Sequence, residues 1–418
     1  MRAIWFLPVL AVLMAGCGSV ATTGVGNEPS PQQNNNRTTE TPRKVDPKLI
    51  EANNRFGFAL LHALREADKG KNILLSPASI TLALAMTYNG AAGETEQAMA
   101  KAMSLGEMDR ETLNQAVLDL RQSLQNADPR VELTIANSLW ARQGVAFKQQ
   151  FLDTNKRYYG AQISVLDFSD PNAPATINRW VDGNTKGKIK KIVDNIPANT
   201  VMFLINAIYF NGKWQKPFDK SLTQQKPFHL ANGEQKPVPM MKQTGRFSYL
   251  KGEGFQMVSL PYGGGRFSMV IVLPDEGVSL SEWMGTLDAN RWKEWTSRLV
   301  MTDGELQLPR FKMDYGRTLN DALKSLGMEV AFLPERADFS GMRDERDLFL
   351  QKVHHQAVVE VDEEGTEAAA VTSVQVGITS VQQPRQPFRM VVDRPFLFAI
   401  RDTRTGIVLF LGAVYEPQ

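Results

Sequence analysis

The sequence predicts an α+β fold, and two observations lead to this prediction. Apolar residues recur mostly at helical spacing in the N-terminal half of the chain and mostly at strand spacing in the C-terminal half. Helices and strands do not alternate regularly, which favours long antiparallel or mixed sheets over a parallel sheet built from βαβ units. Because no repeat and no linker interrupts residues 46–418, we expect one large domain there.

Helical spacing begins at Asp46 and stops near Gly70. A second helix is expected to begin with Ser76 as its N-cap and Pro77 at its first position. This helix is nearly all apolar as far as Tyr88, so we expect it to be buried on most sides. Further helices are predicted over 94–103, 110–125, 147–159, 174–186, 279–297 and 316–326. Strands are predicted over 131–140, 201–210, 256–260, 266–273, 305–312, 349–361, 388–392, 395–401 and 407–414.

The composition is that of a chain with ample material for a packed core. Of its 418 residues 43% are hydrophobic and 22% charged, and the formal net charge is +2. This near-balance gives no reason to expect a nucleic-acid partner. The chain has one cysteine, which excludes intramolecular disulfides and cysteine-rich metal sites.

The N-terminus predicts export and a lipid anchor. Residues 1–16 carry Arg2 and an apolar run of signal-peptide length, too short to span a membrane as a mature helix. The run ends in Leu-Met-Ala-Gly-Cys, which resembles a bacterial lipobox with Cys17 as the lipidated residue. The alternative is an ordinary cleaved signal peptide with an incidental cysteine. We expect secretion across the inner membrane and attachment to the outer membrane or cell surface.

A flexible tether is expected over residues 17–45. Between Gly18 and Lys44 the chain has no Leu, Ile, Met or aromatic residue and is rich in Thr, Asn, Gln, Pro and Gly. Such a stretch cannot bury enough apolar surface to order itself. A chain of this length spans on the order of 30 Å, enough to hold a globular domain clear of a bilayer.

Signatures of catalysis are missing from the sequence. It contains no G-x-S-x-G elbow, Walker loop, Rossmann fingerprint or H-E-x-x-H motif, so we expect no enzyme activity and no cofactor. His354 and His355 adjoin in a predicted strand and should face opposite sides, which disfavours a metal site. Gly263–Gly265 is interpreted as a hairpin turn, and Asp362–Glu364 as a solvated strand end rather than an acid/base pair.

The sequence pattern of the segment after this acidic triplet does not match the position of that segment in the chain. The segment lies between strand regions and is followed by polar, proline-bearing sequence, so it should be an exposed loop. Yet it has the alternation of a strand with one buried face, and conflicts of this kind are expected at functional sites. The face that we expect to be buried carries small or β-branched side chains: Thr366, Ala368, Ala370, Thr372, Val374, Val376 and Ile378.

Five stretches, in order, resemble the serpin family, and the resemblance covers nearly all of residues 46–418. They are N-I-L-L-S-P-A-S-I at 72–80, N-A-I-Y-F-N-G-K-W at 206–214, A-D-F-S-G-M at 337–342, E-E-G-T-E-A-A-A at 363–370 and D-R-P-F-L-F at 393–398. The resemblance implies three β-sheets, about nine helices and an exposed reactive loop at about 363–385.

The resemblance also implies a mechanism. A target serine protease would attack the loop and form an acyl-enzyme, and the cleaved loop would insert as a new central strand of the main sheet. The protease would then be distorted before it can deacylate, so the inhibitor is consumed and turns nothing over. The implied partner is this protease in a covalent complex. The chain is expected to be a monomer apart from its lipid anchor.

Individual positions follow from the same resemblance. The hinge of the loop would comprise Glu363, Gly365, Thr366, Ala368, Ala369 and Ala370. The shutter, a polar cluster where the sheet opens, would comprise Ser76, Ser79, Asn206 and His355. At the breach, where the hinge first enters the sheet, Trp214 would be the aromatic residue. Arg310 would be a basic residue there that can pair with Glu363. Gly365 is a permissive pivot. We expect Thr366 and Ala370 to face solvent in the intact loop.

The family's hinge spacing places the cleaved bond between Thr379 and Ser380. A small β-branched residue beside the bond suits elastase-like or subtilisin-like proteases, with a papain-like cysteine protease as a further candidate. The connection from there to Asp393 is longer than is usual in the family, which leaves Arg385 as an alternative with trypsin-like specificity. Cleavage at Arg385 would make the inserted segment longer than cleavage after Thr379 would.

Two other functions remain open from the sequence. A non-inhibitory serpin that serves as a carrier or binding protein would be cleaved without trapping its protease. A hydrolase is disfavoured because no nucleophile and base are found together.

Overall fold

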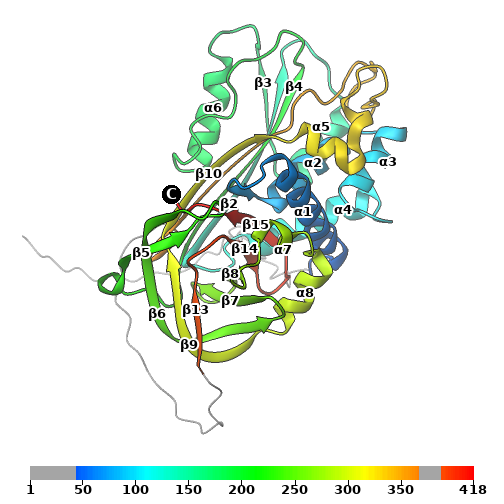
Figure 1. The fold of residues 1–418 in the computed structure, drawn as a ribbon. Helices are drawn as coiled ribbons and strands as arrows, with labels where there is room; N and C mark the ends of the chain where they lie inside the picture. The colour runs from blue at the N-terminus through cyan, green and yellow to red at the C-terminus, as the bar shows by residue number, and fades with distance from the viewer. Residues whose placement is uncertain (1–43, 367–386) are drawn as a thin grey trace, which may run out of the picture. The chain divides into compact units, whose positions relative to one another are not determined.

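The computed structural model describes residues 44–366 and 387–418, and Figure 1 shows its elements in chain order. Nine α-helices lie within these residues: α1 (Pro47–Ala67), α2 (Pro77–Tyr88), α3 (Gly93–Ala102), α4 (Arg110–Leu124), α5 (Gln149–Tyr159), α6 (Ala173–Asn184), α7 (Leu280–Met284), α8 (Ala289–Ser297) and α9 (Asn320–Leu323). In the described part of the chain no helix is long and apolar enough to cross a membrane.

Helix α2 is almost entirely buried. The Ser76 side chain accepts a hydrogen bond from the backbone N–H of Ser79 at 3.2 Å, which confirms Ser76 as the N-cap. All but one of the helix residues are buried, and the helix packs against strands β4 (Met202–Lys213) and β15 (Val408–Val414). The apolar composition of α2 therefore predicts its burial correctly.

The largest sheet has nine strands in the order β1-β15-β14-β8-β7-β6-β9-β13, with β5 paired to β6. Its other strands are β1 (Ile73–Leu75), β5 (Gln224–His229), β6 (Gln235–Gly252), β7 (Phe255–Tyr262), β8 (Phe267–Pro274), β9 (Val300–Pro309), β13 (Phe388–Val391) and β14 (Phe396–Asp402). Only β9 and β13 pair in parallel here. The turn between β7 and β8 confirms the glycine hairpin.

Two smaller sheets complete the described structure. One has the order β12-β4-β2-β3, with β2 (Val131–Arg142), β3 (Gln162–Leu166) and β12 (Gly365–Thr366). The other pairs β10 (Phe311–Thr318) with β11 (His354–Val361). Among the described residues no ladder joins β4 to β11. Three mainly antiparallel sheets and nine helices confirm the predicted α+β class.

Several predicted boundaries are wrong. The strand predicted over 305–312 is divided between β9 and β10 at Arg310, and β10 occupies the start of the helix predicted over 316–326. The helix predicted over 279–297 is two helices, and the strand predicted from residue 349 begins at His354. Strands β1, β3, β5 and β6 were not predicted. Strand β6 is mostly polar or half-exposed and contains two prolines, so its sequence lacks a clear strand signal.

Candidate functional site

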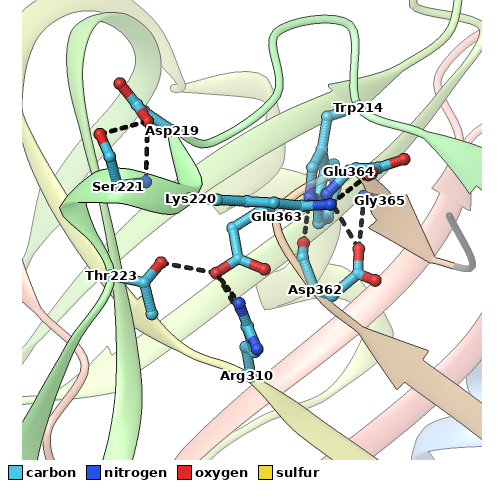
Figure 2. A network of polar contacts seen from close by, with 10 residues as sticks. All are labelled: Trp214, Asp219, Lys220, Ser221, Thr223, Arg310, Asp362, Glu363, Glu364 and Gly365. Atoms are coloured by element: carbon cyan, nitrogen blue, oxygen red, sulfur yellow. Dashed lines mark hydrogen bonds and ion pairs between the residues drawn. The ribbon is translucent and has the colours of Figure 1, made fainter. Parts of the chain in front are cut away.

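The first residues of the predicted hinge are docked on the end of β4. Gly365 and Thr366 form β12, which pairs antiparallel with Lys213 and Gly212. The backbone N–H of Trp214 donates to the Glu364 carbonyl at 2.8 Å, which extends this docking by one residue (Figure 2). The chain is therefore held along β4 before the loop begins.

Glu363 is buried and ion-paired. Its side chain is 1% exposed and accepts hydrogen bonds from the Arg310 guanidinium at 2.5 and 2.8 Å and from the Thr223 hydroxyl at 2.5 Å (Figure 2). Burial raises the pKa of Glu363, but the bonds from Arg310 and Thr223 outweigh it, so this pKa is lowered overall. The interpretation of Asp362–Glu364 as a solvated strand end is thus wrong for Glu363, because Arg310 compensates its buried charge.

The neighbouring acidic residues are also engaged. Glu364 forms an ion pair with Lys220. Asp362 accepts hydrogen bonds at its side chain from the N–H groups of Glu364 and Gly365, at 2.9 and 3.1 Å, which closes a tight turn. The Trp214 indole donates to the Asp362 carbonyl at 2.9 Å (Figure 2). These contacts fix the direction in which the hinge leaves β11.

Gly365 has no tolerated replacement in this arrangement. Its φ of +150° is one that side-chain-bearing residues rarely adopt, and a Cβ there would lie 2.1 Å from the Gly212 carbonyl oxygen. The expected pivot at Gly365 thus has a concrete cause in the close approach of β12 to β4.

The exposure of Thr366 differs from the one expected from the sequence. Thr366 is 2% exposed, and its hydroxyl lies 2.8 Å from the Tyr262 hydroxyl. The expectation that Thr366 faces solvent in the intact chain is wrong, because β12 already pairs with β4 and turns this side chain inward. Tyr262 was not singled out from the sequence, where it lies between the strand predicted over 256–260 and the glycine turn.

The four predicted shutter residues lie on β4, on β11 and at the start of α2, in two adjacent polar clusters. In one, the Ser76 hydroxyl donates to the Leu409 carbonyl at 2.7 Å, and the Ser76 N–H donates to His355 Nε2 at 3.2 Å. In the other, the Ser79 hydroxyl donates to Asn206. Asn206 in turn donates to Asn137 of β2 at 2.5 Å. Asn137 was missed, although an asparagine within the strand predicted over 131–140 was a usable signal.

His355 is held neutral by its surroundings. It is 5% exposed, and burial lowers its pKa to about 3. His354 is half-buried, and burial lowers its pKa as well. Within the described residues no three His, Cys, Asp or Glu side chains are grouped to hold a metal ion.

A cavity of about 560 Å³ lies between β4 and the segment that leads into β11. Its lining includes Met202, Leu204 and Asn206 from β4, with Val353 and His355 opposite them. The cavity thus lies where the ladder between β4 and β11 is missing, and it continues the line along which β12 runs beside β4.

The remaining predicted site residues lie outside the described part of the chain. They are Cys17, Ala368, Ala369, Ala370, Thr379, Ser380 and Arg385.

Comparisons with known proteins agree with this geometry. The family model for serpins (serine protease inhibitors) matches residues 51–417. The human leukocyte elastase inhibitor is 36% identical and covers 88% of this chain and 100% of its own length. An uncharacterized serpin-like protein of Thermococcus kodakarensis is 33% identical over 100% of this chain and 99% of its own. The native thermophilic serpin tengpin superposes with a TM-score of 0.81 at 35% identity, covering 90% of this chain and 96% of its own.

A docked hinge, a cavity beside it and this likeness over nearly the whole domain define the class. The chain belongs to the serpin family, whose model carries the description serine protease inhibitor. The resemblance seen in the sequence is confirmed, and so are the three sheets and nine helices that it implied, within the described residues. A target protease is the partner that this family implies.

Proposed function

We propose that this chain is a suicide-substrate inhibitor of serine endopeptidases of the elastase or subtilisin type. The protease cleaves the reactive loop, the loop inserts as a strand between β4 and β11 and so joins the two smaller sheets, and the acyl-enzyme is trapped. The chain performs no turnover of its own. The specificity for small side chains rests on Thr379 and is supported by relatives named leukocyte elastase inhibitors.

The observation that carries the proposal is the docked hinge beside the gap between β4 and β11. Strand β12 already pairs with β4, so a cleaved loop can extend this ladder residue by residue without a new nucleus. Continuing the alternation from buried Thr366 puts Ala368 and Ala370 on the same inward face. Side chains this small can enter the sheet without overpacking it.

The shutter residues support the same step. A strand that enters between β4 and β11 passes the polar clusters of Ser79, Asn206 and His355, which line the cavity. Their hydrogen bonds join side chains to α2, β2 and β15, so they can be re-formed around a new strand. We propose no catalytic role for any of them.

Incubation with elastase tests the proposal. We expect a covalent complex that survives SDS, with a released C-terminal fragment that begins at Ser380. A chain that is merely cleaved is a binding protein or a substrate.

Thr379→Arg should switch recognition to trypsin while leaving the inserted length unchanged. Stable trypsin complexes of the unmodified chain through Arg385 would show that the assigned bond is wrong.

We also propose that Cys17 carries the lipid that holds the domain at the membrane. Cys17→Ala should abolish membrane association and leave elastase inhibition unchanged, because the tether lacks the apolar residues needed to pack on the domain. Fractionation of membranes and assay of the soluble protein measure both effects. Retention of the Cys17→Ala chain on membranes would contradict lipidation at this residue.

A further inference from the structure

Tyr262 lies beneath the docked hinge and is rigidly held. Its side chain is fully buried, its ring stacks on that of Trp214 with centroids 4.3 Å apart and planes 12° apart, and the ring of Phe210 meets it edge-on at 5.0 Å. On either side of it, the N–H of Gly263 donates to the Lys213 carbonyl and the Pro261 carbonyl accepts from Gln215, both at 2.8 Å. The phenol therefore has a fixed place relative to the end of β4.

The Tyr262 hydroxyl forms a buried hydrogen bond with Thr366, the last described residue of the hinge. The two oxygens are 2.8 Å apart, and Thr366 is 2% exposed. Burial raises the pKa of Tyr262, so the phenol stays protonated and can donate. Removing one partner would leave the other buried and unsatisfied, which costs more than the bond itself contributes.

We propose that Tyr262 is a positioning residue that keeps Thr366 docked on β4 and thereby sets the register in which the loop begins to insert. The inference rests on the proposed inhibitory function. Within the described residues β12 comprises Gly365 and Thr366, and a shift of their pairing by one residue would exchange the inward and outward faces of everything that follows. A specific side-chain bond at its end selects the register that places Ala368 and Ala370 inward.

The bond also affects the race between insertion and deacylation. With Thr366 docked, insertion starts from a formed nucleus. Without the bond the hinge must first be ordered, and ordering each residue costs conformational entropy. Insertion is then slower while deacylation is unchanged, so more inhibitor is cleaved for each protease trapped.

A double-mutant cycle tests this role. Tyr262→Phe and Thr366→Val each remove one hydroxyl and keep the shape of the side chain. Each alone should raise the number of inhibitor molecules consumed per trapped elastase by about fivefold or more, since each leaves an unpaired buried hydroxyl. The double variant should be no worse than either single variant, because all three lack the same bond. Additive effects, or no effect of Tyr262→Phe, would overturn the inference.

Tyr159→Phe is the matched control. Tyr159 is also fully buried, and its hydroxyl donates to Asn114 at 2.8 Å on α4, with no contact to the hinge. It should reduce stability without changing the stoichiometry of inhibition. If the control changes the stoichiometry as much as Tyr262→Phe does, general destabilisation explains the effect and the positioning role fails.

Hydrogen exchange of the intact chain gives a readout that needs no protease. Tyr262→Phe should speed exchange at the amides of Gly365 and Thr366, and the double variant should show the same faster exchange, because it lacks the same bond. Unchanged exchange would overturn the positioning role even if elastase is trapped. If instead the unmodified chain traps no protease while the exchange result holds, the proposed function fails and Tyr262 only orders the hinge.

Discussion

The substitution Ala370→Arg is expected to convert the inhibitor into a substrate, which elastase cleaves and then leaves. Thr366 points inward in β12, and residues at even spacing from it share its face of a strand. Position 370 would therefore be buried on insertion, where an unpaired guanidinium costs several kcal/mol even after relaxation. Since about 1.4 kcal/mol corresponds to a factor of ten, the yield of trapped elastase should fall at least about tenfold.

Position 370 is a better test than position 366. An arginine at 366 would already meet the buried contact with Tyr262 in the intact chain, so it would destabilise the protein before any protease acts. Ala370→Arg should leave the melting temperature of the intact chain unchanged, and measuring it separates the two effects.

Glu367→Arg is the control for this experiment. Residue 367 is one position from Thr366 and so belongs to the outward face after insertion, where an arginine is tolerated. We expect its stoichiometry of inhibition to match that of the unmodified chain. Undiminished trapping by Ala370→Arg, measured as SDS-stable complex per elastase, would show that the loop does not insert.

Acid should destabilise the intact chain through His355. Its pKa is about 3 in the folded protein, against about 6.5 when unfolded. Because the folded value is the lower one, the stabilisation from neutral His355 is fully present above about pH 6.5 and is lost as the pH falls toward 3. Between pH 7 and pH 5 the loss amounts to about 2 kcal/mol, which denaturant unfolding at the two pH values measures.

His355→Gln isolates this contribution. Glutamine offers an acceptor for the Ser76 N–H but does not titrate, so the difference in stability between pH 7 and pH 5 should shrink by about 2 kcal/mol whatever the stability of the variant at pH 7. An unchanged pH dependence would mean that His355 is not the group that takes up the proton.

Local sequence signals predict the elements whose stability is local. Ser76 and Pro77 begin a helix that is apolar all round, and the structure confirms both its start and its burial. Strand β6 could not be predicted in this way, because its side chains are largely polar and its position depends on pairing with β7 and β9. The prediction for β10 was wrong because this strand pairs with β11, about 40 residues later, and nothing in its own residues indicates that partner.

The candidate site shows the same division. The alternation after Thr366 and the acidic triplet were visible in the sequence. The burial of Glu363 depends on Arg310, 53 residues earlier, and that of Thr366 on Tyr262, 104 residues earlier. Long-range pairs of this kind decide whether a polar residue is solvated or buried, and only the folded structure brings them together.

Thermal unfolding of the intact and the loop-cleaved chain tests the central claim most directly. Insertion would add a strand between β4 and β11, supply the missing ladder and bury alternate small side chains, so cleaved protein should unfold at a far higher temperature than intact protein. Cleaved Ala370→Arg should show a smaller gain. A cleaved chain that unfolds at the same temperature as the intact chain, or below it, would contradict loop insertion.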